Sequence, residues 1–265
     1  MKMIAAISTT LVSILLLEPI SSPAQSADYS RYLSPWKTPW DYEGPRGPEH
    51  WSALDPAYAA CNLGKAQSPI DIRSVAKAHL PSLRFDYKRE PIRYVINNGA
   101  TIRVNYHDLP GSGSYLVVGG KRYQLTQFHF HRPSEEYIHG RQYEMVLHLM
   151  HKSSDGEEVG VAVLLKPGRI NATVAQIWKF MPASEGQTEA PGVSVDPAEM
   201  LPNTLGYYLY SGSVTAPPCT EGVKWFVLKT PVDISAAQIA AFARLYPNDA
   251  RPLQPLNGRI VQESD

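Results

Sequence analysis

The length and charge of the chain favour one large globular domain and argue against two classes of partner. Its 265 residues include 25 basic and 25 acidic side chains, so the formal net charge is +0. A balanced charge argues against nucleic acid or an anionic membrane as the partner, because both attract a cationic surface.

The first 27 residues have the pattern of a signal peptide. Lys2 precedes a mostly apolar run over residues 4–17, and the small-residue sequence Ser22-Pro23-Ala24 predicts cleavage near residues 24–27. The apolar run is too short to span a membrane comfortably, and no later stretch is apolar enough. We expect residues 28–265 to form a soluble domain, exported to the periplasm or secreted, with no membrane insertion after cleavage. The oligomeric state stays open.

The body of the chain is predicted to be a series of short strands. Residues 28–55 are rich in tryptophan and proline, which favours an ordered coil over a helix or strand. Later segments are separated by turn signals such as Asn97-Asn98-Gly99, which favours antiparallel pairing over β-α-β units. The expected strands cover residues 83–87, 92–97, 101–106, 114–118, 121–131, 143–151, 159–166, 207–210 and 224–228.

Two segments have the period of amphipathic helices. Asn171 can cap a helix over residues 172–181, and Ser235 can cap a helix over residues 236–245, which Pro247 stops. Apolar side chains recur on one stripe of each segment. We therefore interpret both helices as packing against the core.

Three histidines can meet on one face of the predicted sheet. Residues i and i+2 of a strand share a face, so His129 and His131 point the same way. His148 lies in the next strand and joins them if the two strands pair antiparallel. Three imidazoles on a rigid sheet are typical of a catalytic zinc site with an open fourth position. The residues alone leave a second interpretation, in which the histidines are hydrogen-bonded members of an aromatic-rich core.

The chain contains two cysteines, Cys61 and Cys219. In an oxidising compartment an even pair predicts one disulfide that closes a long loop. The alternative is two separate buried thiols, which the export signal disfavours.

Eight short motifs occur in order over nearly all of the mature chain. They are Trp40-Asp41-Tyr42, Gly47-Pro48-Glu49-His50-Trp51, Gln67-Ser68-Pro69-Ile70-Asp71, Asn97-Asn98-Gly99, Gln127-Phe128-His129-Phe130-His131, His148-Leu149-Met150-His151, Gly212-Ser213-Val214-Thr215-Ala216-Pro217-Pro218 and Arg251-Pro252-Leu253-Gln254-Pro255. In this ordered set the chain resembles the α-class carbonic anhydrases. The resemblance implies a mainly β (α+β) fold, with one catalytic domain (28–265) built on a large twisted, mostly antiparallel sheet and a few peripheral helices. The cysteine pair also resembles the disulfide of exported bacterial members.

The resemblance implies a zinc enzyme, a carbonate dehydratase of the lyase class. The implied reaction is the reversible hydration of carbon dioxide to bicarbonate and a proton through a zinc-bound hydroxide. The Zn²⁺ ligands would be His129, His131 and His148. Three neutral imidazoles leave the ion its full charge, which acidifies a bound water.

Further roles are also implied by the resemblance. Thr215 would accept a hydrogen bond from the hydroxide and direct its own proton to Glu135, because an ionised carboxylate only accepts. Tyr42 would help to order water in the cleft. Gln127, with Asn257 as the weaker candidate, would accept a hydrogen bond from a ligand histidine. The substrate site would combine Thr215 with an apolar wall of Val214, Val223, Trp225 and Met150.

Several positions depart from the family pattern. Ala100 stands where many active members carry a proton-shuttling histidine, so we expect proton transfer to limit turnover. Val146 replaces a glutamate that commonly accepts a hydrogen bond from the third ligand, so we expect His148 to be less fixed unless Glu144 reaches it. Arg103 and Thr126 lie at the cleft mouth, where the family varies, and leave anion and inhibitor preferences open.

A second class of function is a binding or adhesion module. Some relatives keep the fold without catalysis, and those usually lose a zinc histidine. Here all three histidines are present together with Thr215 and Glu135, which favours the enzyme. Hydrolysis of esters is expected only as a side activity of the same site.

Overall fold

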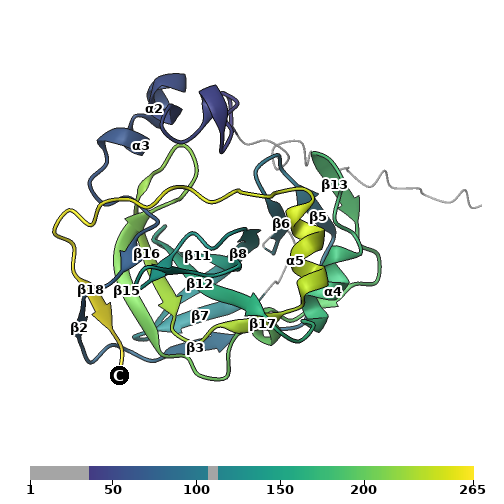
Figure 1. Ribbon diagram of the computed structural model, residues 1–265. Helices are drawn as coiled ribbons and strands as arrows, with labels where there is room; N and C mark the ends of the chain where they lie inside the picture. Colours follow the sequence, from purple (N-terminus) through teal and green to yellow (C-terminus); the bar gives the residue numbers. More distant parts are fainter. Residues whose placement is uncertain (1–35, 107–112) are drawn as a thin grey trace, which may run out of the picture.

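The computed structural model describes residues 36–106 and 113–265, so the predicted signal peptide lies outside the described residues. The described chain is organised around one large twisted sheet (Figure 1). Its thirteen strands are β2 (Val75–Lys77), β3 (Leu83–Asp86), β5 (Tyr94–Asn97), β6 (Ile102–Asn105), β7 (Tyr115–Val118), β8 (Lys121–His131), β11 (Met145–Ser153), β12 (Glu158–Pro167), β13 (Gly186–Glu189), β15 (Tyr207–Ser213), β16 (Glu221–Leu228), β17 (Val232–Ile234) and β18 (Val261–Glu263).

The expected mainly β architecture is confirmed, with a mixed sheet. The order along the main path is β13-β5-β6-β8-β11-β12-β16-β15-β18-β2, while β3, β7 and β17 pair beside it. The central strands β6, β8, β11 and β12 are antiparallel, as the short turn-punctuated spacing predicts. Parallel pairs occur between β12 and β16, β12 and β17, and β18 and β2. These parallel partners are far apart in sequence, so the spacing of neighbouring segments could not predict them.

Two smaller sheets and several short helices complete the described chain. One sheet joins β1 (Asp71–Ile72), β9 (Tyr137–Ile138) and β10 (Arg141–Gln142), and the other joins β4 (Glu90–Pro91) and β14 (Ser194–Val195). The helices are η1 (Gly44–Arg46), α2 (Trp51–Leu54), η2 (Pro56–Tyr58), α3 (Ala60–Leu63), α4 (Ala172–Trp178), η3 (Pro197–Met200) and α5 (Ala236–Ala243). Among the described residues, no helix combines the length and apolar character needed to cross a membrane.

The two longest helices begin where their capping residues predict. The Asn171 side chain accepts a hydrogen bond from the backbone N–H of Val174, and Ser235 and Gln238 form a reciprocal capping box. The helices end at Trp178 and Ala243, earlier than the expected residues 181 and 245. The next residues instead form tighter turns, in which Phe180 and Leu245 each bond to the carbonyl three positions back.

The central sheet separates the main apolar core from the cleft. On one face, Phe128 and Phe130 of β8 are fully buried among apolar side chains that include Ile177 of α4 and Phe242 of α5. The helices α4 and α5 lie side by side against this part of the sheet (Figure 1). Because strand residues alternate between faces, the intervening histidine, His129, points to the opposite side.

Candidate metal centre and cleft

The β8–β11 ladder brings the three predicted histidines together. His148 of β11 lies directly opposite His129 of β8, and His131 follows two residues along the same face. Nitrogens of the three rings all lie within 4.8 Å of one another. His131 and His148 are buried, and His129 is half-buried and lines the cleft. The register therefore produces the convergence that the sequence predicts.

Each histidine has one ring nitrogen held by an oxygen acceptor. His129 Nδ1 lies 2.9 Å from Gln127 Oε1, and His131 Nδ1 lies 2.8 Å from the Asp249 carbonyl oxygen. His148 Nε2 lies 3.2 Å from Glu136 Oε1. A carbonyl or carboxylate oxygen only accepts, so each of these nitrogens carries the proton. The opposite nitrogen of each ring is then a lone-pair donor.

The remaining nitrogens fit a metal ion. His131 Nε2 and His148 Nδ1 are buried and have no hydrogen-bond partner among the described residues. Unpartnered buried nitrogens are costly unless something coordinates them. Three imidazoles, each fixed by an acceptor on its outer nitrogen, match the donor set that is typical of a three-ligand zinc site.

The third histidine differs electrostatically from the other two. Burial and the neighbouring imidazoles hold the pKa of His129 and His131 well below its usual value. Burial also lowers the pKa of His148, but the carboxylates of Glu136 and Glu135 outweigh it and raise the pKa above its usual value. His148 is therefore the most basic of the three rings.

The expectation that His148 lacks a carboxylate acceptor is wrong. Val146 is buried and cannot accept, and Glu144 is exposed. Glu136 is itself fully buried and supplies the carboxylate, with its two oxygens 3.2 and 3.3 Å from His148 Nε2. Sequence reasoning missed Glu136 because it lies in an irregular segment between strands. The sequence sign that could have indicated this role is that Glu136 directly follows Glu135, which the family resemblance already assigns to the site.

Asn257 is also corrected as a partner of the ligand histidines. It is exposed, and its side-chain nitrogen donates to the Lys65 carbonyl at 3.0 Å. The backbone carbonyl of Asp249 instead holds His131. A backbone acceptor leaves no signature in side-chain patterns, so only the folded path of the chain reveals it.

Thr215 and Glu135 lie together beside the triad. Thr215 is nearly buried, lines the cleft and follows the end of β15. Burial raises the pKa of Glu135 to about 7, while His148 and the nearby Thr215 hydroxyl oppose the rise. The Arg251 backbone N–H donates to Glu135 Oε1 at 2.9 Å, whereas Glu135 Oε2 has no partner of hydrogen-bond geometry in the described chain. The Thr215 hydroxyl is thus near enough to affect the pKa of Glu135, but no hydrogen bond of strict geometry joins it to Oε2 among the described residues.

A cleft of about 310 Å³ opens onto the three histidines and Thr215. Of the predicted substrate and water residues, Tyr42, Met150, Val214 and Trp225 line it, and so does Ala100. Burial raises the pKa of Tyr42 well above its usual value. Val223 is not among the lining residues. It is buried in the apolar cluster that includes Trp225.

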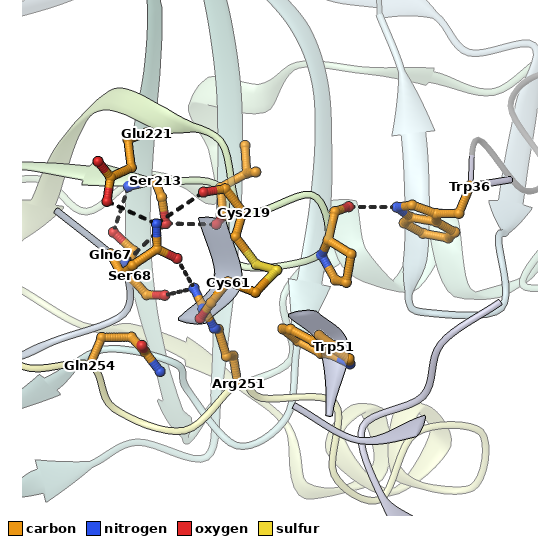
Figure 2. The surroundings of a disulfide bond; sticks show 12 residues. Trp36, Trp51, Cys61, Gln67, Ser68, Ser213, Cys219, Glu221, Arg251 and Gln254 are labelled. Atoms are coloured by element: carbon orange, nitrogen blue, oxygen red, sulfur yellow. Dashed lines mark hydrogen bonds between the residues drawn. A yellow bond between two sulfur atoms is a disulfide. The ribbon is translucent and has the colours of Figure 1, made fainter. Parts of the chain in front are cut away.

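The predicted disulfide is present and fixes the loop that carries Thr215. Cys61 of α3 is bonded to Cys219, across 158 residues of sequence. Figure 2 shows the surrounding network, in which Gln67 Nε2 donates to the Cys219 carbonyl at 3.0 Å. The buried Arg251 guanidinium donates to Gln67 Oε1 and to the Ser68 and Cys61 carbonyls. Gln67 thus holds the Cys219 end of the disulfide, Arg251 holds the Cys61 end, and the two side chains are bonded to each other.

A tryptophan not predicted as a site residue forms part of the cleft wall. The Trp36 indole N–H donates to the Pro217 carbonyl at 2.7 Å (Figure 2). Its ring packs edge-on to Trp40 and lines the cleft beside the small Ala100 side chain. The composition of residues 28–55 predicted an ordered coil, but nothing in that composition indicated that this indole would reach the cleft.

Comparison with known proteins places the chain in a family. The family model described as eukaryotic-type carbonic anhydrase matches residues 46–265. A carbonic anhydrase of Nostoc sp. is 40% identical, with 85% of this chain and 86% of the relative covered. The solved α-carbonic anhydrase of Thermovibrio ammonificans, in complex with the inhibitor sulfanilamide, is 42% identical, covers 86% of this chain and 100% of its own, and superposes with a TM-score of 0.81. Dioscorin dioA3 of Dioscorea japonica is 33% identical, with 82% of each chain covered. The chain belongs to the family of eukaryotic-type carbonic anhydrases.

Proposed function

We propose that this chain is a zinc-dependent enzyme that catalyses the reversible hydration of carbon dioxide to bicarbonate and a proton. The observation that carries the proposal is the histidine triad, in which the outer nitrogens are bonded to acceptors and the inner nitrogens converge. His129 and His131 would bind the ion through Nε2, and His148 would bind it through Nδ1. When bound, zinc acts as a Lewis acid that makes a nucleophile available from water at neutral pH.

Thr215 and Glu135 orient the nucleophile in this proposal. With its proton directed at Glu135, the Thr215 oxygen presents only lone pairs to the cleft and can only accept a hydrogen bond there. A nucleophile that donates to Thr215 is thereby held with its own lone pair directed away from the threonine. The buried position of Glu135 and its bond from the Arg251 backbone keep the pair in place.

The apolar side of the cleft suits an uncharged substrate. Val214, Trp225 and Met150 line it, and their side chains offer water no hydrogen-bonding group stronger than the thioether of Met150, because the Trp225 indole N–H already donates to the Ser213 carbonyl. Carbon dioxide is small and apolar, so it gains by replacing poorly held water at such a wall. Tyr42, whose raised pKa keeps its phenol protonated, would bind and orient water in the same cleft.

We further propose that residues 1–27 are a signal peptide and that the mature enzyme acts in the periplasm or outside the cell. The Cys61–Cys219 disulfide supports this location, because disulfides persist in oxidising compartments. The balanced charge leaves small molecules, and not nucleic acid, as the expected partners.

Metal analysis and a carbon dioxide hydration assay test the proposal. The mature protein should carry one zinc per chain and accelerate hydration. His148→Ala should lose zinc and activity together, whereas His79→Ala should keep both, because the His79 side chain is 98% exposed. Full zinc occupancy in His148→Ala would contradict the assignment of His148 as a zinc ligand. A zinc-loaded wild type that does not hydrate carbon dioxide would instead favour the alternative function, a binding module without catalysis.

A further inference from the structure

One buried arginine connects the two residues that orient the nucleophile in the proposed reaction. Arg251 is buried and is not among the residues that line the cleft. Its backbone N–H donates to Glu135 Oε1 at 2.9 Å. Its guanidinium donates to Gln67 Oε1 at 2.9 Å, to the Ser68 carbonyl at 2.7 Å and to the Cys61 carbonyl at 2.9 Å (Figure 2). A buried guanidinium with three oxygen partners keeps one orientation, so it can fix the segments to which it donates.

The first of these segments holds the end of the loop that carries Thr215. This Thr215 loop (residues 214–220) joins β15 to β16. The Gln67 side-chain nitrogen donates to the Cys219 carbonyl and to Glu221 Oε1, each at 3.0 Å. Both N–H groups of the amide are thus used at the loop, while its oxygen accepts from Arg251. Without the guanidinium, the buried amide oxygen loses this partner and the amide is no longer held against the loop.

The second segment holds the start of the Thr215 loop. The Ser68 backbone N–H donates to Ser213 Oγ at 3.0 Å, and the Ser213 backbone N–H donates to Ser68 Oγ at 3.1 Å. The fit is close, because a Cβ on the neighbouring Gly212 would lie 2.1 Å from Ser68 Oγ. Ser213 lies two residues before Thr215. The position of Ser68, whose carbonyl accepts from Arg251, therefore sets where the chain enters the loop.

We propose that Arg251 is a positioning residue that aligns Thr215 with Glu135. Its backbone holds Glu135, while its side chain holds the start of the Thr215 loop through Ser68 and the end through Gln67. Thr215 and Glu135 come from separate segments, and a misplacement of about 1 Å can cost about 100-fold in rate. The effect on the rate rests on the proposed function, whereas the effect on the Thr215 loop itself does not.

The histidine triad is held by a different part of the molecule. His129, His131 and His148 lie on β8 and β11, where the antiparallel ladder sets their register. The acceptors on their outer nitrogens are not the oxygens to which the Arg251 guanidinium donates. Removing the guanidinium should therefore lower the rate of hydration and leave zinc binding nearly unchanged. A general loss of folded protein would lower both together.

The test compares Arg251→Gln with Arg259→Gln in the mature, zinc-loaded protein with its disulfide intact. Arg259 is the matched control, because its guanidinium also donates to three backbone carbonyls, none of which belongs to the Thr215 loop. Arg251→Gln should lower kcat/KM for hydration about 10- to 100-fold while the zinc dissociation constant stays within about threefold of wild type. Arg259→Gln should leave both near wild type. Arg251→Lys keeps the charge without the planar fork and should lose most of the same rate.

Hydrogen exchange of backbone amides measures the Thr215 loop without the reaction. The Val214 N–H is bonded to the Thr220 carbonyl, and the Cys219 N–H is bonded to the Ala216 carbonyl. Both amides should exchange about 10-fold faster in Arg251→Gln than in wild type or Arg259→Gln, because the loop opens more easily.

A double substitution tests whether Arg251 acts through Thr215. In a Thr215→Ala background, Arg251→Gln should cause little further loss of rate, since the residue that it positions is already absent. Fully additive losses from the two substitutions would contradict the proposal.

Other outcomes also overturn the role of Arg251. Wild-type rate and amide exchange in a folded Arg251→Gln would do so, and so would equal losses in Arg251→Gln and Arg259→Gln. If Arg251→Gln does not fold, Ser68→Ala removes the acceptor of the Ser213 N–H and should lower the rate about 3- to 10-fold with faster exchange in the loop; no change there overturns the proposal. Absence of hydration in the wild type counts against the proposed function, and the exchange comparison still decides the role of Arg251.

Discussion

Glu136 offers the sharpest test of how this chain holds its third ligand histidine. Both of its carboxylate oxygens lie close to His148 Nε2, at 3.2 and 3.3 Å, and both residues are fully buried. A hydrogen bond to a charged group contributes about 1.5–3 kcal/mol, and this long, shared geometry places the bond near the lower figure. Since about 1.4 kcal/mol is tenfold in affinity, the contact is worth roughly one order of magnitude in zinc binding.

Two substitutions of Glu136 separate charge from hydrogen bonding. Glu136→Gln keeps a neutral acceptor and should raise the zinc dissociation constant by about 3- to 10-fold. Glu136→Val leaves the His148 N–H buried without a partner and should raise it by about 10- to 100-fold, the range typical of acceptors behind a metal ligand. Competition with a chromogenic chelator at fixed pH measures both values. Glu144→Gln is the control, because Glu144 is exposed.

A zinc affinity within twofold of wild type in a folded Glu136→Val variant would refute this reasoning. Thermal melting of the metal-free forms establishes that the variant is folded. Val146→Glu would restore the glutamate of the family pattern, but we expect this variant to bind zinc more weakly than wild type. The acceptor is already supplied by Glu136, and a new glutamate would join two carboxylates that are already buried nearby.

Three further predictions concern the disulfide, acid stability and proton transfer. Replacing both Cys61 and Cys219 by alanine should lower the free energy of unfolding by about 3–5 kcal/mol in chemical denaturation, because the bond closes a loop of 158 residues; an unchanged midpoint would contradict this. Hydrogen bonds from Lys121 and Lys224 lower the pKa of Glu157 to about 2 in the folded protein. The carboxylate therefore stabilises the fold above the unfolded pKa near 4.5, and this contribution is lost as the pH falls towards 2. Between these pH values, the free energy of unfolding of Glu157→Gln should fall less than that of wild type. Ala100→His should raise kcat in weak buffer by up to about 100-fold, with kcat/KM nearly unchanged; a wild-type kcat that is high and indifferent to imidazole would contradict proton-limited turnover.

The sequence predicts most strongly where side-chain periodicity and burial coincide. Alternation along β8 places His129 and His131 on one face and the phenylalanines on the other, and the observed burial follows it. The capping residues of α4 and α5 predicted where both helices begin, because hydrogen bonds between residues close in sequence decide a helix start. The pairing of His148 opposite His129 needed the antiparallel register, which the residues allowed and the family resemblance favoured.

The features that sequence reasoning missed depend on the path of irregular segments. Glu135 and Glu136 are neighbours in the chain but approach His148 at different ring nitrogens, with Glu135 Oε2 3.9 Å from Nδ1 and Glu136 Oε1 3.2 Å from Nε2. No periodic pattern assigns the two roles, because the segment is neither helix nor central strand. The loss of a carboxylate at Val146 could be read from the sequence, whereas its replacement from a different segment could not.

The composition of the cleft constrains how a proton can leave it. Besides the three histidines of the triad, the titratable groups that line it among the described residues are Tyr42 and Arg103. Burial raises the pKa of Tyr42 well above its usual value, and a guanidinium stays charged at neutral pH, so neither can relay a proton. We therefore expect water and diffusible buffer, and none of the described side chains, to carry the proton. Imidazole can enter the cleft uncharged and leave it as a cation that carries the proton. Buffer rescue by imidazole therefore reports on the missing histidine at position 100.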